Sequence, residues 1–178
     1  MNHPVTIESY YTKSKTFWIP IFCPERRRSH YSAIVEIYRA PTHPVMKSWN
    51  KAQINIYDKK QDLIIFRYKR NYSYVPRPLY VRQKDKEYIV TTGAYQCISI
   101  CDLQERHMTD YVWPNDEAYE DGDGFCPTGF DWKDNNLIVY GSLFNGPPQI
   151  MTIHNAYLDN LHFDNVTFEN NEEEILYE

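Results

Sequence analysis

The chain has 178 residues, of which 42% are hydrophobic and 16% aromatic, and its formal net charge is −5. This length and hydrophobic content fit one folded domain and exclude global disorder. The charges are divided unevenly, because residues 1–90 carry 17 Lys or Arg and 7 Asp or Glu, whereas residues 91–178 carry 2 and 17. The asymmetry indicates either charged partners or mutual neutralisation of the two halves within the fold, and both interpretations stay open.

Cysteine usage and the absence of apolar runs predict the compartment. The N-terminus shows no basic region followed by an apolar one, and no apolar run reaches the roughly 18 residues of a membrane span. The cysteines are Cys23, Cys97, Cys101 and Cys126, and they lack the paired spacing of a structural zinc site. We therefore expect a cytoplasmic protein with four free thiols, no disulfide, no metal and no cofactor.

Segments in which apolar and polar residues alternate recur along the chain, whereas helical periodicity is missing. The predicted strands, in chain order, are residues 32–39, 53–58, 63–68, 87–92, 95–101, 136–140 and 149–154. The short polar turn at 59–62 predicts a hairpin between the second and third of them. We predict an all-β fold of antiparallel sheets, with one domain over residues 1–168 and an acidic C-terminal tail over residues 169–178.

A weak internal repeat relates two parts of the chain. The segment Tyr88-Ile89-Val90, Gly93 and Ile98-Ser99-Ile100-Cys101-Asp102-Leu103 recurs as Leu137-Ile138-Val139, Gly141 and Met151-Thr152-Ile153-His154-Asn155. Over residues 84–163 the pattern resembles the blades of WD-type and related β-propellers, in which a short hairpin ends in an apolar-x-apolar-x-Asp strand. The Gly-His and Trp-Asp signatures are missing. The resemblance implies a partial β-propeller-like stack of sheets, and a β-sandwich is the alternative.

The first candidate binding segment is basic and aromatic. Residues 67–86 hold seven Lys or Arg and four Tyr, a combination that can neutralise phosphates and stack on exposed bases. Cations on edge strands also protect against aggregation, so a purely structural role is the alternative. The candidate residues are Arg67, Lys69, Arg70, Tyr72, Tyr74, Arg77 and Arg82.

The second candidate is an acidic and aromatic loop at residues 113–125. It lacks the ordered ligand spacing and terminal Glu of a calcium-binding EF-hand loop, and it suits a basic protein surface. A solvated loop between strands is the alternative. The candidate binding residues are Trp113, Asp116, Glu117, Tyr119, Glu120, Asp121, Asp123 and Phe125.

Motifs for catalysis are missing. None of the six His lies in a known catalytic motif, and the chain has only six Gly and no phosphate-binding loop. A Cys126 nucleophile with His107 or His154 is the one pair that the residue types suggest, and their spacing in the sequence does not support it. We therefore assign no catalytic residue.

Three functions are compatible with these patterns. We favour a non-enzymatic protein-binding or adaptor domain whose partner is a protein with a basic surface. The second hypothesis is a phage- or virus-type inhibitor of a nucleic-acid enzyme that acts by acidic charge mimicry, and the third is a hydrolase. Nucleic acid is a less favoured partner, no membrane association is expected, and homo-oligomerisation is left open.

Overall fold

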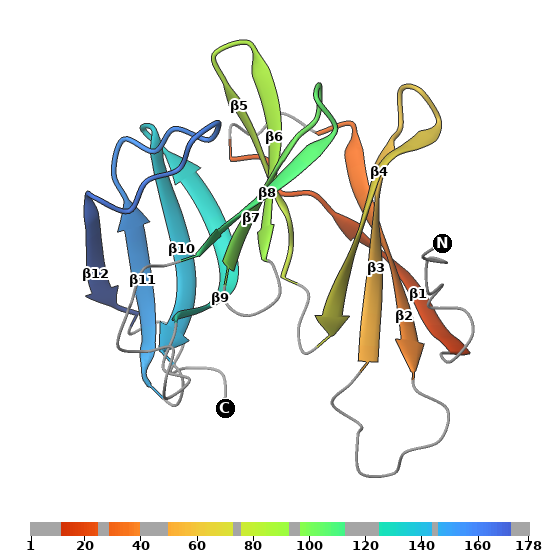
Figure 1. Cartoon of the computed structure of the whole chain (residues 1–178), viewed down its shortest axis with the longest axis horizontal. Coiled ribbons are helices and arrows are strands. Elements are labelled where there is room, and N and C mark those ends of the chain that lie inside the picture. The colour runs from red at the N-terminus through yellow and green to blue at the C-terminus, as the bar shows by residue number, and fades with distance from the viewer. Residues whose placement is uncertain are drawn as a thin grey trace, which may run out of the picture. The chain divides into compact units, whose positions relative to one another are not determined.

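A computed structural model describes residues 12–24, 29–39, 50–72, 76–92, 97–112, 125–143 and 146–171. Within these ranges the chain forms β-strands and turns and no helix, which confirms the predicted all-β fold (Figure 1). Among the described residues, no helix is therefore long and apolar enough to cross a membrane. Every strand pair within the sheets is antiparallel, also as predicted.

The described residues form twelve strands in three four-stranded sheets, and in each sheet strands that follow one another in sequence are neighbours. The first sheet contains β1 (Thr12–Pro20), β2 (Tyr31–Arg39), β3 (Asn50–Asp58) and β4 (Leu63–Tyr72). The second contains β5 (Leu79–Gln83), β6 (Lys86–Thr92), β7 (Cys97–Asp102) and β8 (His107–Val112). The third contains β9 (Phe125–Lys133), β10 (Asn136–Leu143), β11 (Pro148–Ile153) and β12 (Val166–Asn170).

The chain divides into two compact units, which we describe separately. The first unit takes residues 1–20 and 30–74 and contains the first sheet, and the second takes residues 21–29 and 75–178. The single domain over residues 1–168 stays a prediction. Of the predicted acidic tail, Glu169 and Asn170 belong to β12, and residues 172–178 lie outside the described residues.

In the first unit, one face of the sheet is apolar and the other is polar. Alternation along β2 and β3 places Ala33, Val35, Ala52, Ile54 and Ile56 on the apolar face, where each is completely buried. Burial of an Ile side chain contributes about 1.5–3 kcal/mol, so this face supplies much of the stability of the unit. The polar face is left with mixed charged, amide and aromatic side chains.

In the second unit, the two sheets share one apolar core. Leu79, Val81, Val90, Ile98 and Ile100 come from one face of the second sheet. They pack in one cluster with residues of the third sheet and of the segment after β11: Phe125, Phe130, Leu137, Val139, Met151, Ile153, Ala156, Leu158 and Leu161. The segment after β1 also belongs to this unit, and the N–H of its Phe22 donates to Pro78 O at 2.9 Å.

The predicted repeat coincides with equivalent strands of two sheets. Its first parts lie on β6 and β10, each the second strand of its sheet, and its second parts on β7 and β11, each the third strand. The first sheet carries the same third-strand pattern, Ile54-Asn55-Ile56-Tyr57-Asp58, which our sequence analysis missed. Three sheets of one strand order are compatible with both the propeller-like and the sandwich prediction.

The same turn follows two of these third strands. Asp58 Oδ1 accepts hydrogen bonds from the backbone N–H groups of Lys60 at 2.8 Å and Gln61 at 3.3 Å. Asp102 Oδ1 accepts the equivalent pair from Gln104 at 2.9 Å and Glu105 at 3.0 Å. Because an Asp side chain can replace a backbone carbonyl as acceptor in a turn, the terminal Asp of the strand pattern fixes the hairpin that follows it.

Candidate functional site

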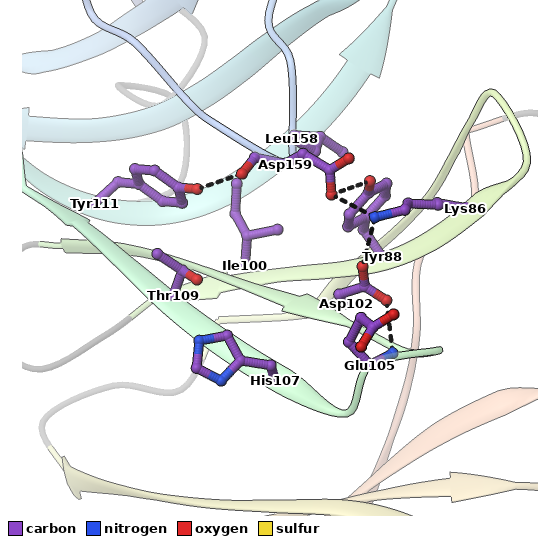
Figure 2. Close-up of a pocket in the computed structure, with 10 residues that line it drawn as sticks. All are labelled: Lys86, Tyr88, Ile100, Asp102, Glu105, His107, Thr109, Tyr111, Leu158 and Asp159. Atoms are coloured by element: carbon purple, nitrogen blue, oxygen red, sulfur yellow. Dashed lines mark hydrogen bonds and ion pairs between the residues drawn. The ribbon is translucent and has the colours of Figure 1, made fainter.

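The described part of the second unit contains an open cavity of about 180 Å³ on the core-facing side of the second sheet. Ten residues line it, and Figure 2 shows how they lie. They come from β6, β7, the turn after β7, β8 and the segment after β11, and they are Lys86, Tyr88, Ile100, Asp102, Glu105, His107, Thr109, Tyr111, Leu158 and Asp159. We call this cavity the Asp159 pocket.

Strand register explains why these side chains meet. Tyr88 pairs with Asp102 across β6 and β7, and Asp102 pairs with His107 across β7 and β8. Directly paired residues point to the same face of a sheet, so all three face the segment that contains Asp159. The alternation of side chains thus places residues of three strands on one wall of the pocket.

The opposite wall is the segment after β11, and Gln83 of β5 holds it in place. The Gln83 side-chain amide donates to Ala156 O at 2.8 Å and accepts from the Leu158 N–H at 3.0 Å. Ala156 and Leu158 are buried in the shared core, with 5% and 1% of their surface exposed. The backbone leading to Asp159 is therefore fixed by both hydrogen bonds and packing.

Asp159 is the centre of the polar contacts in the pocket. Its Oδ1 accepts hydrogen bonds from Tyr88 OH at 2.7 Å and from Lys86 Nζ at 3.1 Å, and its Oδ2 accepts one from Tyr157 OH at 3.2 Å. The hydrogen bond from Tyr88 is the main cause that holds the pKa of Asp159 below its ordinary value, and Lys86 and Tyr157 act in the same direction. Asp159 is therefore an anion at neutral pH.

Lys86 and Tyr88 are held in their protonated forms. Hydrogen bonds to Asp159 and Asp102 raise the pKa of Lys86, whose Nζ lies 3.3 Å from Asp102 Oδ2. Burial, followed by the hydrogen bond to Asp159, raises the pKa of Tyr88 well above its ordinary value. Neither group is available as a general base at neutral pH, because each would first have to lose a strongly held proton.

The mouth of the pocket is formed by exposed side chains. Glu105, His107 and Thr109 are all exposed, and among the described residues no hydrogen bond reaches the Glu105 carboxylate. Tyr111 lies further along the same face and donates through its OH to Asp159 O at 3.3 Å. Figure 2 shows His107 and Thr109 on the strand side and Asp159 across from them.

The pocket is negatively charged and small. Three carboxylates, those of Asp102, Glu105 and Asp159, surround it, and Lys86 is the one Lys or Arg among its lining residues. Pockets for drug-sized ligands and cofactors measure about 300–1,000 Å³, so a volume of about 180 Å³ suits one side chain better. Within the described residues no group of three or more His, Cys, Asp or Glu is placed to hold a metal ion.

The acidic and aromatic loop of the sequence analysis lies almost wholly outside the described residues. This applies to Trp113, Asp116, Glu117, Tyr119, Glu120, Asp121 and Asp123. The remaining candidate, Phe125, begins β9, has 1% of its surface exposed and belongs to the shared core of the second unit. Its ring lies 6.0 Å from that of Phe168.

The basic and aromatic segment is divided between the two units. Arg67 and Lys69 are exposed on β4 of the first unit, whereas Arg77 and Arg82 are exposed in the second. The Arg77 guanidinium lies 5.4 Å from the centre of the Phe22 ring. Of the other candidates, only the backbone of Arg70 and Tyr72 is described, as part of β4, and Tyr74 lies outside the described residues.

The four cysteines are free thiols in the structure. Cys97 and Cys101 are buried, and Cys23 and Cys126 are half-buried. Burial raises the pKa of the Cys101 thiol to about 12, which makes it a poor nucleophile at neutral pH. Of the His residues considered as partners of Cys126, His107 lines the Asp159 pocket and His154 Nε2 lies 2.8 Å from Thr167 Oγ1.

Sequence reasoning did not select the residues of the Asp159 pocket. Asp102 was noted as the end of a repeat strand, and Lys86 was counted in the basic segment, but neither was assigned to a site. Asp159 follows β11 in a segment without strand periodicity, so no local signal marks it. The pairing of β7 with β6 and β8 was the information that would have located one wall.

Comparison of the chain with models of known protein families, with curated proteins and with solved structures found no match. The likeness to propeller blades over residues 84–163 therefore remains a resemblance in strand pattern. The Asp159 pocket has to be interpreted from its own chemistry.

Proposed function

We propose that this chain is a non-enzymatic protein-binding domain that recognises a basic surface on another protein. The observation that carries the proposal is the Asp159 pocket, in which three carboxylates and one lysine surround a cavity of side-chain size. A Lys or Arg side chain of a partner would enter a negative potential in a cavity that Tyr88 and Tyr111 also line. Carboxylates and aromatic rings both attract cations, and a desolvated cation–ring contact contributes about 2 kcal/mol or more.

Binding is favoured over catalysis by the protonation states in the pocket. Lys86 and Tyr88 keep their protons because their pKa values are raised, and Asp159 is a weak base because its pKa is lowered. A hydrolase would need a group poised to exchange a proton near neutral pH. These three groups therefore give the hydrolase hypothesis no support.

The inhibitor that mimics nucleic-acid charge is a weaker alternative. It depends on the acidic loop at residues 113–125 and on the tail at 169–178, most of which lies outside the described residues. Free thiols and the absence, among the described residues, of a membrane-spanning helix suit a cytoplasmic protein, which we include in the proposal.

The proposal can be tested with a fluorescein-labelled peptide of alternating Gly and Arg, and a Gly–Glu peptide as the matched probe. We expect the full chain to bind the first peptide and not the second in anisotropy titrations. Glu105→Gln combined with Asp102→Asn should weaken binding about two- to thirtyfold, which is the effect of two exposed charge pairs of 0.2–1 kcal/mol each. Asp102→Asn keeps a side-chain oxygen that can accept the two backbone hydrogen bonds of the turn.

Two further variants make the test specific. Asp164→Asn with Glu169→Gln removes the same charge from exposed positions of the same unit and should leave the affinity unchanged. Lys86→Gln removes the internal cation and should strengthen binding, an effect that partial unfolding cannot produce. Equal weakening by both double variants, or weaker binding of the Lys86→Gln variant, would contradict a role for the pocket.

A further inference from the structure

The polar face of the first sheet presents a surface of another kind. Strand register places Trp18, Ile34, Asn55 and Arg67 side by side across β1, β2, β3 and β4. The next row toward one end of the sheet is Thr16, Glu36, Gln53 and Lys69. We call these two rows, together with Lys13, Tyr38, Lys51 and Tyr57 on the same side, the polar face of the first sheet.

Positive charge predominates on this face. It carries Lys13, Lys51, Arg67 and Lys69 against one carboxylate, that of Glu36. Arg67 and Lys69 are exposed on the edge strand β4.

The single carboxylate of the face is already engaged. Glu36 Oε1 forms an ion pair with Lys13, and Glu36 Oε2 accepts hydrogen bonds from Gln53 Nε2 at 2.9 Å and Asn55 Nδ2 at 3.2 Å. Lys13 and the two amides hold the pKa of Glu36 below its ordinary value, with the hydrogen bond from Lys13 the largest cause. Lys13 therefore neutralises Glu36 within the face, and the charges of Lys51, Arg67 and Lys69 make the named side chains of the face net positive.

An exposed aromatic pair lies in the same face. Trp18 has 57% of its surface exposed, the highest value among the large hydrophobic side chains that the structure describes. Its ring meets that of Tyr57 edge to face, with centroids 5.4 Å apart and planes at 89°. Tyr57 is fixed in turn by a hydrogen bond from its OH to Asp62 in the following turn. A Trp that is more than half exposed on a sheet face suits contact with a ligand.

We propose that the polar face of the first sheet binds single-stranded nucleic acid. Aromatic side chains on a four-stranded sheet can stack with two or three unpaired bases, and neighbouring cations can neutralise the backbone phosphates. Here Trp18 supplies a stacking surface, and Arg67 and Lys69 lie on the same face three strands away, about 14 Å at ordinary strand spacing. This surface belongs to the first unit and does not depend on the Asp159 pocket.

Single strands fit these features better than duplexes or membranes. A duplex hides the faces of its bases, so an exposed Trp would contribute little to binding it. An anionic membrane would be bound by the cations without need of an aromatic pair held edge to face. The combination of Trp18 with Arg67 and Lys69 therefore points to unpaired bases joined by phosphates.

The test uses the full chain and fluorescein-labelled oligo(dT) and oligo(U) in anisotropy titrations at about 50 mM and about 200 mM salt. We expect binding that weakens with salt, and a matched duplex should compete poorly. Trp18→Ala should weaken binding at least about fivefold, the lower end of what one stacked base contributes, and Trp18→Phe should recover most of the loss. Trp18→Leu serves as a second variant if Trp18→Ala does not fold.

The contribution of the cations is measured by the salt slope. Arg67→Gln with Lys69→Gln should reduce the slope of log K against log salt by about 1.4, since each phosphate contact to a single strand contributes about 0.7. Lys84→Gln with Lys133→Gln removes two exposed cations of the other unit and should leave the slope unchanged. Circular dichroism and melting confirm that each variant is folded.

Three results would overturn the proposal. The first is the absence of oligonucleotide binding at low salt by the folded chain. The second is binding that Trp18→Ala does not weaken, which would indicate attraction of any polyanion. The third is tighter binding to phosphatidylserine vesicles than to oligonucleotides, which would assign the face to a membrane surface.

Discussion

At the scale of residues, two aspartates with the same structural role differ in their surroundings. Asp58 and Asp102 each cap a turn through Oδ1. Asp58 is almost fully buried, and His30 Nε2 lies 3.9 Å from its Oδ1. Asp102 instead opens into the Asp159 pocket, where Lys86 contacts it. A repeated structural residue has thus become part of a candidate site in the second sheet only.

The hydrogen bonds to Asp159 predict how stability depends on pH. Its pKa is lowered in the folded state, so its contribution is present above the unfolded value of about 3.9 and is lost as pH falls through the folded value. Lys86 and Tyr88 have raised pKa values and keep their protons in acid. Asp159→Asn should therefore lower the free energy of unfolding at neutral pH.

That loss should shrink in acid, where the wild-type carboxylate is protonated as well. Urea unfolding of both proteins between about pH 7 and about pH 3 measures the difference. Asp164→Asn, at an exposed position of the same unit, is the control. A difference between wild type and Asp159→Asn that is the same at every pH would show that the ionised carboxylate contributes nothing.

At the scale of elements, the β9–β10 pair contains two glycines in different surroundings. A Cβ added at Gly141 would overlap the carbonyl oxygen of Cys126 and lie 2.7 Å from Cε1 of Phe125. A Cβ added at Gly129 would meet its nearest neighbour, Tyr140 Cδ2, at an ordinary 3.7 Å. The register shift next to Gly141 brings its backbone close to β9.

We expect Gly141→Ala to destabilise the protein by about 1–3 kcal/mol, because the buried backbone of β9 and the Phe125 ring cannot move away without cost. Gly129→Ala should be neutral or stabilise by about 0.5–1 kcal/mol, since Ala restricts the unfolded chain more than Gly does. Chemical denaturation of the two variants provides the measurement. Equal stabilities of the two variants would show that the close approach at Gly141 is absent.

The strands that the sequence predicted share a physical property. Each sheet has two inner strands, and all six were predicted from alternation: β2, β3, β6, β7, β10 and β11. Of the edge strands only β4 was predicted, and β1, β5, β8, β9 and β12 were missed. Edge strands bury less of their surface, and β1 and β12 are largely exposed, so their sequences are less constrained to alternate.

The sites were less predictable than the sheets for a related reason. The alternation that places Arg67 and Lys69 on one face of β4 is local, and the sequence contained it. Trp18 joins them only through the pairing of four strands, and Asp159 joins Lys86 only through a contact 73 residues apart. Local patterns cannot specify such contacts.

At the scale of the whole molecule, the charge asymmetry of the sequence follows the two units. Among described side chains, the first unit has seven Lys or Arg and three Asp or Glu, whereas the second has six and ten. The two proposed surfaces carry the sign of their unit, a cationic sheet face in one and an anionic pocket in the other. Variants of Trp18 and variants of Glu105 therefore test separate partners.

The proposal of a basic protein partner depends on the Asp159 pocket being the place where a cationic side chain binds. The most direct measurement is a ¹H–¹⁵N NMR titration of the full chain with the Gly–Arg peptide. We expect the largest shifts at the amides of Lys86, Asp102, Glu105, Leu158 and Asp159. The Asp164→Asn control should show the same pattern of shifts as the wild type. Shifts confined to residues 113–124 or 172–178 would contradict the pocket and assign the cation to the acidic loop or tail instead.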